Sequence, residues 1–270
     1  MRISEWLRDS EKKLSDAGIG TARLDALVLL EDVSGRDRAW LLAHPEHKLS
    51  PSEIAKLEKL LSQRAEHYPL AYVRNKTEFY GREFVITPAV LEPRPESETM
   101  IDCLKRLSGL PKGVRIADVG AGSGAIGITA QLELPDTQVE LLEIDAEAIK
   151  VAQINVDKYT IRIPVTRSDL LTMTGQDNNV LLCNLPYVPE GYQLNPPAMR
   201  EPAIAIFGGP DGLDVYRALF IQVKKLKNKP LFILTESLPP QHSDLAHIAS
   251  LADYRLSVTD DFIQVFELSP

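Results

Sequence analysis

The segment Asp118-Val119-Gly120-Ala121-Gly122-Ser123-Gly124-Ala125-Ile126-Gly127 lies between an apolar run at 114–119 and a helical pattern at 125–134. Glycines let a backbone turn tightly and approach a ligand, and the N-terminus of the following helix presents free N–H groups. Gly122–Gly127 also fits the pattern Gly-x-Gly-x-x-Gly, and Glu143 follows 21 residues after Gly122, where a carboxylate can bind ribose hydroxyls. These residues leave two cofactors open: a nicotinamide or flavin dinucleotide, and S-adenosylmethionine.

Strand and helix patterns alternate on both sides of this loop. Apolar runs predict seven strands, at 114–119, 138–144, 161–166, 180–183, 230–235, 254–258 and 263–268. Between them, helical patterns lie at 125–134, 146–159, 211–227 and 241–251. Such alternation predicts a doubly wound, mostly parallel α/β sheet. Only four residues separate the last two strands, so these two must be antiparallel, because a parallel crossover needs about a dozen residues.

The N-terminal part of the chain has helical spacing throughout and no glycine-rich loop. We expect a helix over 21–33 with Leu24 in its apolar stripe and Gly35 as its stop. Ser50-Pro51-Ser52-Glu53 predicts the start of another helix, with Ser50 as N-cap and Glu53 closing a capping box. We therefore expect a small helical bundle that binds a partner or supports the sheet.

Three domains follow from these patterns. Residues 1–74 form the helical domain, residues 75–92 form a β-hairpin linker, and residues 93–270 form the α/β domain. The hairpin is expected to turn at Gly81-Arg82. After the linker, a helix is expected from Pro95 to about Leu107.

The composition excludes several classes of protein. The 270 residues carry a net charge of −8, and the first 80 hold 13 basic and 13 acidic side chains, so all of the excess acid falls on residues 81–270. An acidic chain is a poor candidate for gripping nucleic acid phosphates. Cys103 and Cys183 lack neighbours at metal-ligand spacing, so we expect no metal site. No apolar run reaches the roughly 18 residues of a membrane span, and we expect a cytoplasmic protein with no membrane partner.

Two further segments stand at predicted strand ends. Asp169 and Leu170 follow the third strand, where Asp169 could accept from the amino group of an adenine while Leu170 packs on the ring edge. A turn-initiating Asp is the alternative. Asn184-Leu185-Pro186-Tyr187 follows the fourth strand, at the sheet edge where ligands bind in open α/β sheets.

The Asn-Leu-Pro-Tyr segment suits a planar amino group. The Asn184 side chain offers one acceptor and two donors in a plane, Pro186 leaves neighbouring carbonyls free as acceptors, and Tyr187 can stack on a flat π-system. Together they would hold an –NH₂ group for attack on the methyl of a sulfonium, with orientation and electrostatics as the catalytic means. Taken alone, the segment could also be a simple Asn-x-Pro turn.

Three other blocks accompany this segment. Arg64–Glu98 contains Glu78-Phe79-Tyr80-Gly81 and Pro93-Arg94-Pro95-Glu96-Ser97-Glu98, and Glu201–Leu213 reads EPAIAIFGGPDGL. Glu236 with Gln241 is a weaker third match. With these blocks the chain resembles, over essentially its whole length, the release factor glutamine methyltransferases of the HemK/PrmC family.

The resemblance implies a class I S-adenosylmethionine-dependent methyltransferase, with a Rossmann-like seven-stranded sheet. It would place Gly120, Ala121, Gly122, Ser123, Gly124, Glu143, Asp169, Leu170 and Asn184 around the cofactor. It would place Asn184, Leu185, Pro186 and Tyr187 on the target amide, with Asn184, Pro186 and Tyr187 as catalytic residues. The implied substrate is the glutamine of the Gly-Gly-Gln loop of class 1 peptide chain release factors, and the helical bundle would help dock that protein.

Three features depart from the family pattern, and other functions compete. Leu185 stands where the family has proline, Glu143 stands where aspartate is usual, and Glu236 is followed by Ser237-Leu238-Pro239-Pro240 where the family has a glycine-containing stretch. A relative could methylate a glutamine of a ribosomal protein, and Asn-x-Pro-Tyr also serves methyltransferases of adenine and guanine amino groups. A dinucleotide oxidoreductase would share the glycines but would have no use for Asn184–Tyr187. A non-enzymatic adaptor with a vestigial pocket is the last alternative.

Overall fold

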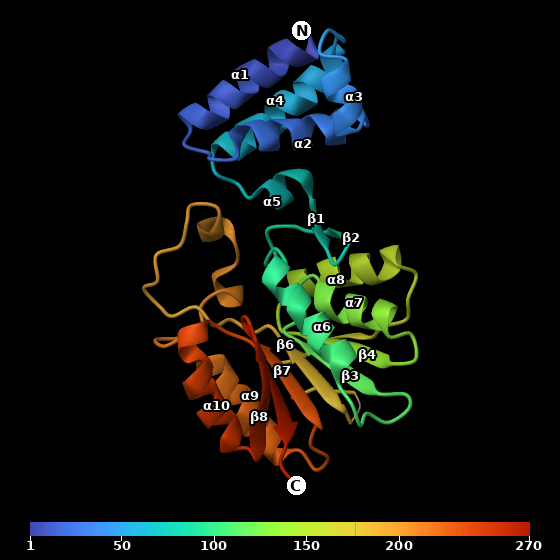
Figure 1. The fold of residues 1–270 in the computed structure, drawn as a ribbon, viewed down its shortest axis with the longest axis vertical. Helices are drawn as coiled ribbons and strands as arrows, with labels where there is room; N and C mark the ends of the chain where they lie inside the picture. The colour runs from blue at the N-terminus through green and yellow to red at the C-terminus, as the bar shows by residue number, and fades with distance from the viewer. Residues whose placement is uncertain (176) are drawn as a thin grey trace. The chain divides into compact units, whose positions relative to one another are not determined.

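The structure is a computed structural model that describes residues 1–175 and 177–270. The chain divides into two compact units, which Figure 1 shows in colours that follow the sequence. The first unit contains Met1–Lys76 with Asn195–Arg200, and the second contains Thr77–Leu194 with Glu201–Pro270. Within the described residues, no helix combines the length and the apolar character that a membrane crossing requires.

The first unit is helical. Its helices are α1 (Ile3–Asp16), α2 (Ala22–Ser34), α3 (Arg38–Ala43), α4 (Pro51–Ala65) and α5 (Leu70–Arg74). The apolar core between them is built around fully buried side chains such as Trp6, Leu30 and Leu57. Inside this core the Arg64 guanidinium donates to the Asp25 carboxylate at 2.7 Å, so a buried charge pair links α4 to α2.

The predicted start of α4 and the predicted end of α2 are confirmed, but the predicted apolar face of α2 is not. Glu53 N donates to Ser50 Oγ at 3.3 Å and Ser50 N donates to Glu53 Oε2 at 2.7 Å, which is the capping box. Gly35 ends α2 with a φ of 65°. Leu24, in contrast, is 47% exposed, because the buried face of α2 runs through Ala26, Leu29 and Leu30. The short helix α5 has no counterpart in the sequence prediction.

The second unit is built on a seven-stranded sheet. Its strands are β3 (Arg115–Val119), β4 (Gln138–Glu143), β5 (Val165–Arg167), β6 (Val180–Cys183), β7 (Phe232–Glu236), β8 (Tyr254–Asp260) and β9 (Ile263–Leu268). They lie in the order β5-β4-β3-β6-β7-β9-β8. All neighbouring pairs are parallel except β7–β9 and β8–β9. The predicted doubly wound, mostly parallel sheet and its antiparallel last pair are confirmed.

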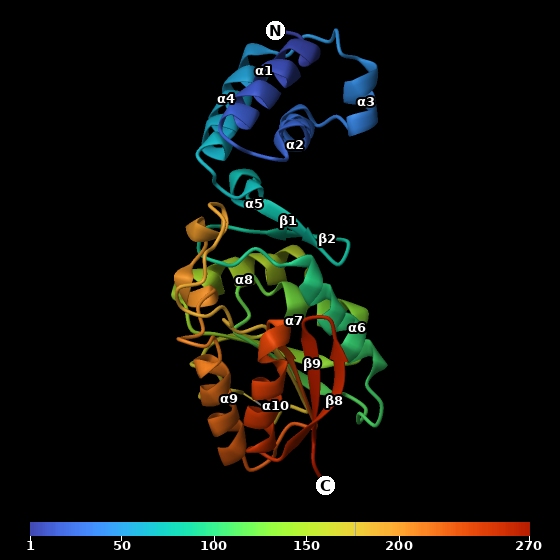
Figure 2. The same ribbon diagram turned by 60° about the vertical axis from the view of Figure 1, so that its left-hand side comes forward.

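Helices cover both faces of this sheet (Figures 1 and 2). On one face, α6 (Glu98–Arg106), α7 (Ala125–Glu133) and α8 (Ala146–Lys158) pack on side chains such as Ile116 and Leu182. On the other face, α9 (Asp214–Lys225) and α10 (His242–Ser250) pack on the alternate side chains, such as Ala117 and Leu181. This alternation follows from the period of two in a strand, and it explains why the central strands are apolar on both sides.

The connections position the second unit's functional residues. The strands β1 (Lys76–Phe79) and β2 (Arg82–Val85) form the hairpin, which turns at Tyr80-Gly81 with φ values of 52° and 67°. The predicted turn at Gly81-Arg82 was one residue late, because a two-residue turn of this twist needs positive φ at both positions. The 3₁₀ turn η1 (Pro95–Ser97) leads into α6, and β5 begins later than the predicted 161–166.

Candidate active site

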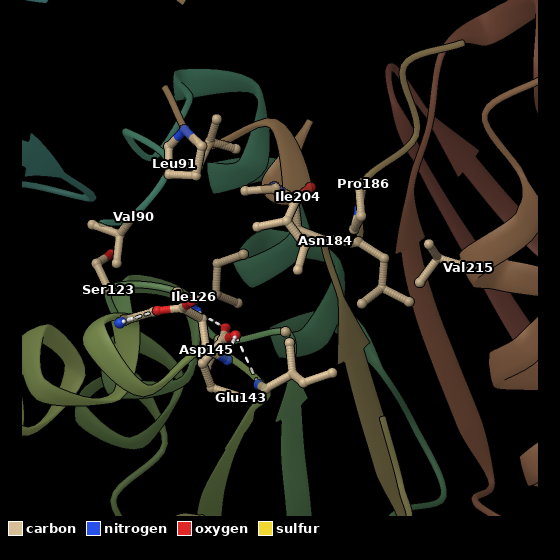
Figure 3. A pocket seen from close by; sticks show the side chains of 18 of the residues that line it. Val90, Leu91, Ser123, Ile126, Glu143, Asp145, Asn184, Pro186, Ile204 and Val215 are labelled. Carbon is tan, nitrogen blue, oxygen red and sulfur yellow. Dashed lines mark hydrogen bonds between the residues drawn. The ribbon is translucent and has the colours of Figure 1, made fainter. Parts of the chain in front are cut away.

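A pocket of about 410 Å³ opens at the C-terminal edge of β3, β4, β5 and β6 (Figure 3). The strand order reverses between β3 and β6, and this switch point is where open α/β sheets bind their ligands. The volume lies in the range of small-molecule and cofactor sites. Figure 3 shows Glu143 and Asp145 on one side of the pocket and Asn184, Pro186 and Ile204 on the other.

The glycine loop forms the floor of the pocket. Gly120, Gly122 and Gly124 have φ values of 72°, 55° and 78°, so the loop follows a path that residues with a Cβ rarely adopt. Asp118, at the end of β3, accepts a hydrogen bond from the N–H of Gly127 at 2.7 Å and thereby ties the strand to α7. Burial raises the pKa of Asp118 to about 7.

Glu143 has the bonding capacity that a ribose-binding residue needs. Its Oε1 accepts from the N–H groups of Ile144 and Asp145, at 2.8 and 2.9 Å, and its Oε2 accepts from the N–H of Gly122 at 2.8 Å. A carboxylate has about four lone-pair sites, so one site on Oε2 is left for a ligand hydroxyl. The same contacts fix the carboxylate against the glycine loop.

Asp169 and Leu170 stand on a tight turn beside the pocket. The Ser168 hydroxyl donates to the carbonyl of Leu170 at 2.7 Å, and Leu170 has a φ of 51°. Both Asp169 and Leu170 line the pocket. The two residues therefore form a turn and also border the cavity, and the adenine contact stays a prediction.

Asn184 is held from one side by two partners. Its Nδ2 donates to Ser97 Oγ at 2.9 Å and to Glu236 Oε2 at 3.0 Å. Ser97 Oγ in turn donates to Glu236 Oε2 at 2.6 Å. Ser97 and Glu236 are both almost completely buried, and burial raises the pKa of Glu236 above its ordinary value. The Asn184 amide is therefore fixed before any ligand arrives.

Tyr187 belongs to the same cluster. Its hydroxyl donates to Glu236 Oε1 at 3.0 Å, and burial together with the Glu236 carboxylate raises the pKa of Tyr187, so the phenol keeps its proton. The main chain of Tyr187 is fixed as well, because Gln241 Nε2 donates to its carbonyl at 2.8 Å. Glu236 and Gln241 were the weakest match in the sequence. In the structure Glu236 binds the side chain of Tyr187, and Gln241 binds its backbone carbonyl.

The glycine-containing block after Glu201 closes around this loop. Gly212 has a φ of 82°, and a Cβ added there would lie 2.1 Å from the Tyr187 carbonyl oxygen. Val188 N donates to Ile206 O at 2.9 Å, which pairs the two segments directly. The block therefore has a structural role: because Gly212 has no Cβ, the block can pack closely against the backbone of the Asn184–Tyr187 loop.

One hydroxyl connects the ends of β6 and β7. Tyr216, which is fully buried on α9, lies with its hydroxyl oxygen 2.9 Å from Cys183 O and 2.6 Å from Glu236 O. The N–H groups of Leu185 and Glu236 donate to the same oxygen at 3.4 and 3.3 Å. Tyr216 thereby fixes the spacing between the strand end that carries Asn184 and the one that carries Glu236.

An ion pair lies at the rim of the pocket. Arg94 donates to the carboxylate of Glu201, and Glu201 also accepts from the N–H of Glu92 at 3.3 Å. Burial raises the pKa of Glu201, while the Arg94 charge lowers it. This contact joins the segment after the hairpin to the segment that carries Ile204, and both segments contribute to the pocket wall.

The structure brings most of the predicted site residues together. Ten of them line the pocket: Gly120, Ala121, Gly122, Ser123, Glu143, Asp169, Leu170, Asn184, Leu185 and Pro186. Gly124 is the N-cap of α7 instead, and Tyr187, which donates its hydroxyl to Glu236, is not among the lining residues. Ser97 and Tyr216 were missed, although the family-like Pro93–Glu98 block was a signal for Ser97.

This pocket fits S-adenosylmethionine. Glu143 keeps a free acceptor site for a ribose hydroxyl, and the apolar side chains of Val90, Leu91, Ile126 and Ile204 line the same cavity. The sheet order and the site define a methyltransferase that uses S-adenosylmethionine as its cofactor.

Comparisons with known proteins agree with this class. The family model of the PrmC N-terminal domain matches residues 5–74, and that of the methyltransferase small domain matches residues 95–199. Among solved structures, a methyltransferase from Pyrococcus furiosus superposes with a TM-score of 0.53 at 13% identity, covering 82% of this chain and 100% of that one. A T. thermophilus 16S rRNA N2 G1207 methyltransferase, in complex with AdoMet and guanosine, superposes at 0.52 and 16% identity, covering 72% and 50%. These likenesses show the fold.

Sequence relatives narrow the assignment. The release factor glutamine methyltransferase of Koribacter versatilis is 34% identical over 230 residues, which cover 83% of this chain and 81% of the relative. The enzyme of the same name from Geobacter sulfurreducens is 31% identical over 239 residues, covering 87% and 82%. The chain belongs to the release factor glutamine methyltransferase family.

Proposed function

We propose that this enzyme transfers a methyl group from S-adenosylmethionine to the side-chain amide nitrogen of the glutamine in the Gly-Gly-Gln motif of class 1 peptide chain release factors. One observation carries the proposal: Asn184, Leu185 and Pro186 line the same pocket as the glycine loop and Glu143. A planar amide bound by the first group would then meet a cofactor bound by the second.

The cofactor residues have distinct roles in this proposal. The loop of Gly120–Gly124 lies under the cofactor, Glu143 accepts from its ribose, and Asp169 with Leu170 flanks its adenine. When bound, S-adenosylmethionine supplies a methyl carbon bonded to a positively charged sulfur. The protein contributes a fixed pocket, with the Glu143 carboxylate already held by three backbone N–H groups.

The target amide needs orientation more than a strong base. An amide nitrogen is a weak nucleophile because its lone pair is delocalised into the carbonyl. Acceptors such as Asn184 Oδ1 and the carbonyls of the Leu185–Pro186 backbone would bind its two hydrogens and turn the nitrogen toward the methyl carbon. The new carbon–nitrogen bond forms as the carbon–sulfur pair stays with sulfur, and one N–H proton leaves to solvent.

The remaining parts of the chain fit a protein substrate in the cytoplasm. The helical unit, whose sequence matches the PrmC N-terminal domain, would help to dock the release factor. The net charge of −8 favours a protein substrate over a nucleic acid among enzymes that bind an amino group in this way.

A panel of substrates tests this function. The full-length protein is incubated with labelled S-adenosylmethionine and, separately, an unmethylated class 1 release factor, ribosomal proteins, or DNA. We expect label in the release factor only. Label in a ribosomal protein or in DNA, with none in the release factor, would replace the proposed substrate. Calorimetry with S-adenosylmethionine and NAD checks the cofactor, and we expect binding of the first alone.

A further inference from the structure

The Glu236 carboxylate is the centre of the amide-binding cluster, yet it does not line the pocket. It lies at the end of β7 and is 1% exposed. All three of its side-chain partners are neutral: Ser97, Asn184 and Tyr187. Among the described residues, no Lys or Arg forms an ion pair with it. A buried carboxylate without a cationic partner is costly to keep, so its presence calls for a reason.

The hydrogen-bond directions supply that reason. An ionised carboxylate can only accept, so Ser97 must donate its single hydroxyl proton to Glu236. The Ser97 oxygen can then only accept from Asn184, and Glu236 Oε2 also accepts from the same Asn184 nitrogen. With the amide turned over, Asn184 Oδ1 would face a carboxylate oxygen at about the same distance, and two acceptors would repel. One orientation of the Asn184 amide satisfies every group.

We infer that Glu236 is a positioning residue for the amide-methylation site: its negative charge fixes the Asn184 amide, directly and through Ser97, so that Asn184 Oδ1 is the atom presented to the substrate. The inference rests on the proposed function. Asn184 Nδ2 donates to both Ser97 and Glu236, and no described residue donates to its Oδ1. The other carboxylate oxygen receives the Tyr187 hydroxyl and so holds the phenol ring beside the same loop.

This role explains why an amide in place of Glu236 would be inadequate. A glutamine has one accepting and one donating face. Whichever way it turned, either Tyr187 or the pair of Ser97 and Asn184 would meet an NH₂ group in place of an acceptor. In one case the Asn184 amide turns and presents hydrogens to the substrate amide, and in the other the Tyr187 hydroxyl must reverse. In the first case the reacting nitrogen loses its fixed direction, and in the second the buried Tyr187 proton loses the acceptor that holds the phenol ring.

Protonation of Glu236 should have a similar effect, since a carboxylic acid is also a donor. The polar groups that face it are Tyr187 and Tyr216, Glu96 from η1, and Ser97 with Asn184, while Ile263 lies opposite it on β9. The two phenols keep their protons because their pKa values are raised. Glu96 adds negative charge and, with burial, raises the pKa of Glu236. The methylation rate should therefore fall as the pH is lowered and Glu236 takes up a proton.

Glu236→Gln in the full-length enzyme tests the inference. We expect kcat with an unmethylated release factor to fall at least about 30-fold, which corresponds to about 2 kcal/mol of transition-state stabilisation. The affinity for S-adenosylmethionine, measured by calorimetry, should change less than twofold. The acid limb of the wild-type pH–kcat profile should be absent from the variant. Thr235→Val is the matched control: this neighbouring side chain is equally buried, its hydroxyl has no partner among the described residues, and kcat should not change.

A retained kcat in Glu236→Gln, or a lowered kcat with the acid limb intact, would overturn the inference. If the variant does not fold, Ser97→Ala decides, because it removes the intermediate oxygen and keeps the charge. That variant should lower kcat at least threefold with unchanged cofactor affinity, and an unchanged kcat would overturn the inference. Failure of the proposed function looks different, since the wild-type enzyme itself would then leave the release factor unmethylated.

Discussion

Removal of one hydroxyl, by Tyr216→Phe, should loosen the active site from a distance. The Tyr216 oxygen lies 2.6 Å from Glu236 O and 2.9 Å from Cys183 O, and it accepts from Leu185 N and Glu236 N at 3.4 and 3.3 Å. A hydroxyl has one proton, so it makes one strong donated bond and two long accepted bonds. Phenylalanine removes the donated bond to Glu236 O and the common partner of Cys183 O, Leu185 N and Glu236 N at the ends of β6 and β7.

The expected cost can be set from these contacts. A buried polar group that loses its partner costs about 1–3 kcal/mol, and the two long bonds belong at the low end. We therefore expect a loss of about 2–3 kcal/mol in the free energy of unfolding. Because the strand ends that carry Asn184 and Glu236 lose their common anchor, kcat should also fall about tenfold. Urea unfolding and single-turnover methylation measure the two effects.

Tyr254→Phe is the matched control. The Tyr254 hydroxyl is also buried, but it makes one hydrogen bond, to Pro230 O at 2.7 Å, at the opposite end of the sheet. Its loss should cost about 1 kcal/mol of stability and leave kcat unchanged. If both variants lose equal stability and both keep full kcat, Tyr216 does not position the site and the reasoning is refuted.

Three further changes have defined outcomes. Asp118→Asn should abolish a pH dependence of the free energy of unfolding. Burial raises the pKa of Asp118 in the folded protein from 3.8 to about 7, so between these two pH values unfolding releases a proton. The free energy of unfolding of the wild type should therefore fall by up to about 4 kcal/mol as the pH rises from the lower value to the higher. Equal slopes of unfolding free energy against pH for both proteins would contradict this. Gly212→Ala should lower kcat more than 100-fold, because its Cβ would displace the Tyr187 carbonyl, whereas Gly191→Ala, at a φ of 83° with open space around it, should keep full activity in the same methylation assay. Leu185→Pro should keep kcat within about threefold, since it removes one long hydrogen bond at 3.4 Å, and a severe loss would show that the loop depends on that N–H.

Local patterns predicted the elements that are determined locally. The glycine loop, the strand before it and the helix after it follow from a few adjacent residues, and the capping box at Ser50–Glu53 needs only four. The antiparallel last strands followed from the length of their connection. These features are set by backbone sterics and short-range hydrogen bonds, which a sequence displays directly.

The contacts that fix the site are long-range, and the patterns did not show them. Ser97 and Asn184 are 87 residues apart in the sequence. Tyr216 is 31 residues from Leu185, whose N–H donates a hydrogen bond to the Tyr216 hydroxyl. Tyr216 falls within the helix predicted at 211–227, and nothing adjacent to it in the sequence marks its hydroxyl as a hydrogen-bonding group of the site. The family-like blocks identified Glu236 and Gln241 as a pair. Only the fold shows that Glu236 accepts a hydrogen bond from the Tyr187 side chain and that Gln241 donates one to the Tyr187 carbonyl.

The central claim is that the enzyme methylates a glutamine side-chain amide bound by Asn184. Tandem mass spectrometry of the Gly-Gly-Gln peptide tests it directly, after incubation of the unmethylated release factor and S-adenosylmethionine with wild-type enzyme or with Asn184→Ala. We expect one added CH₂ unit on the side-chain amide nitrogen of that glutamine with the wild type, and none with the variant, which should still bind the cofactor. An unmodified glutamine with the wild type, or full methylation by Asn184→Ala, would contradict it.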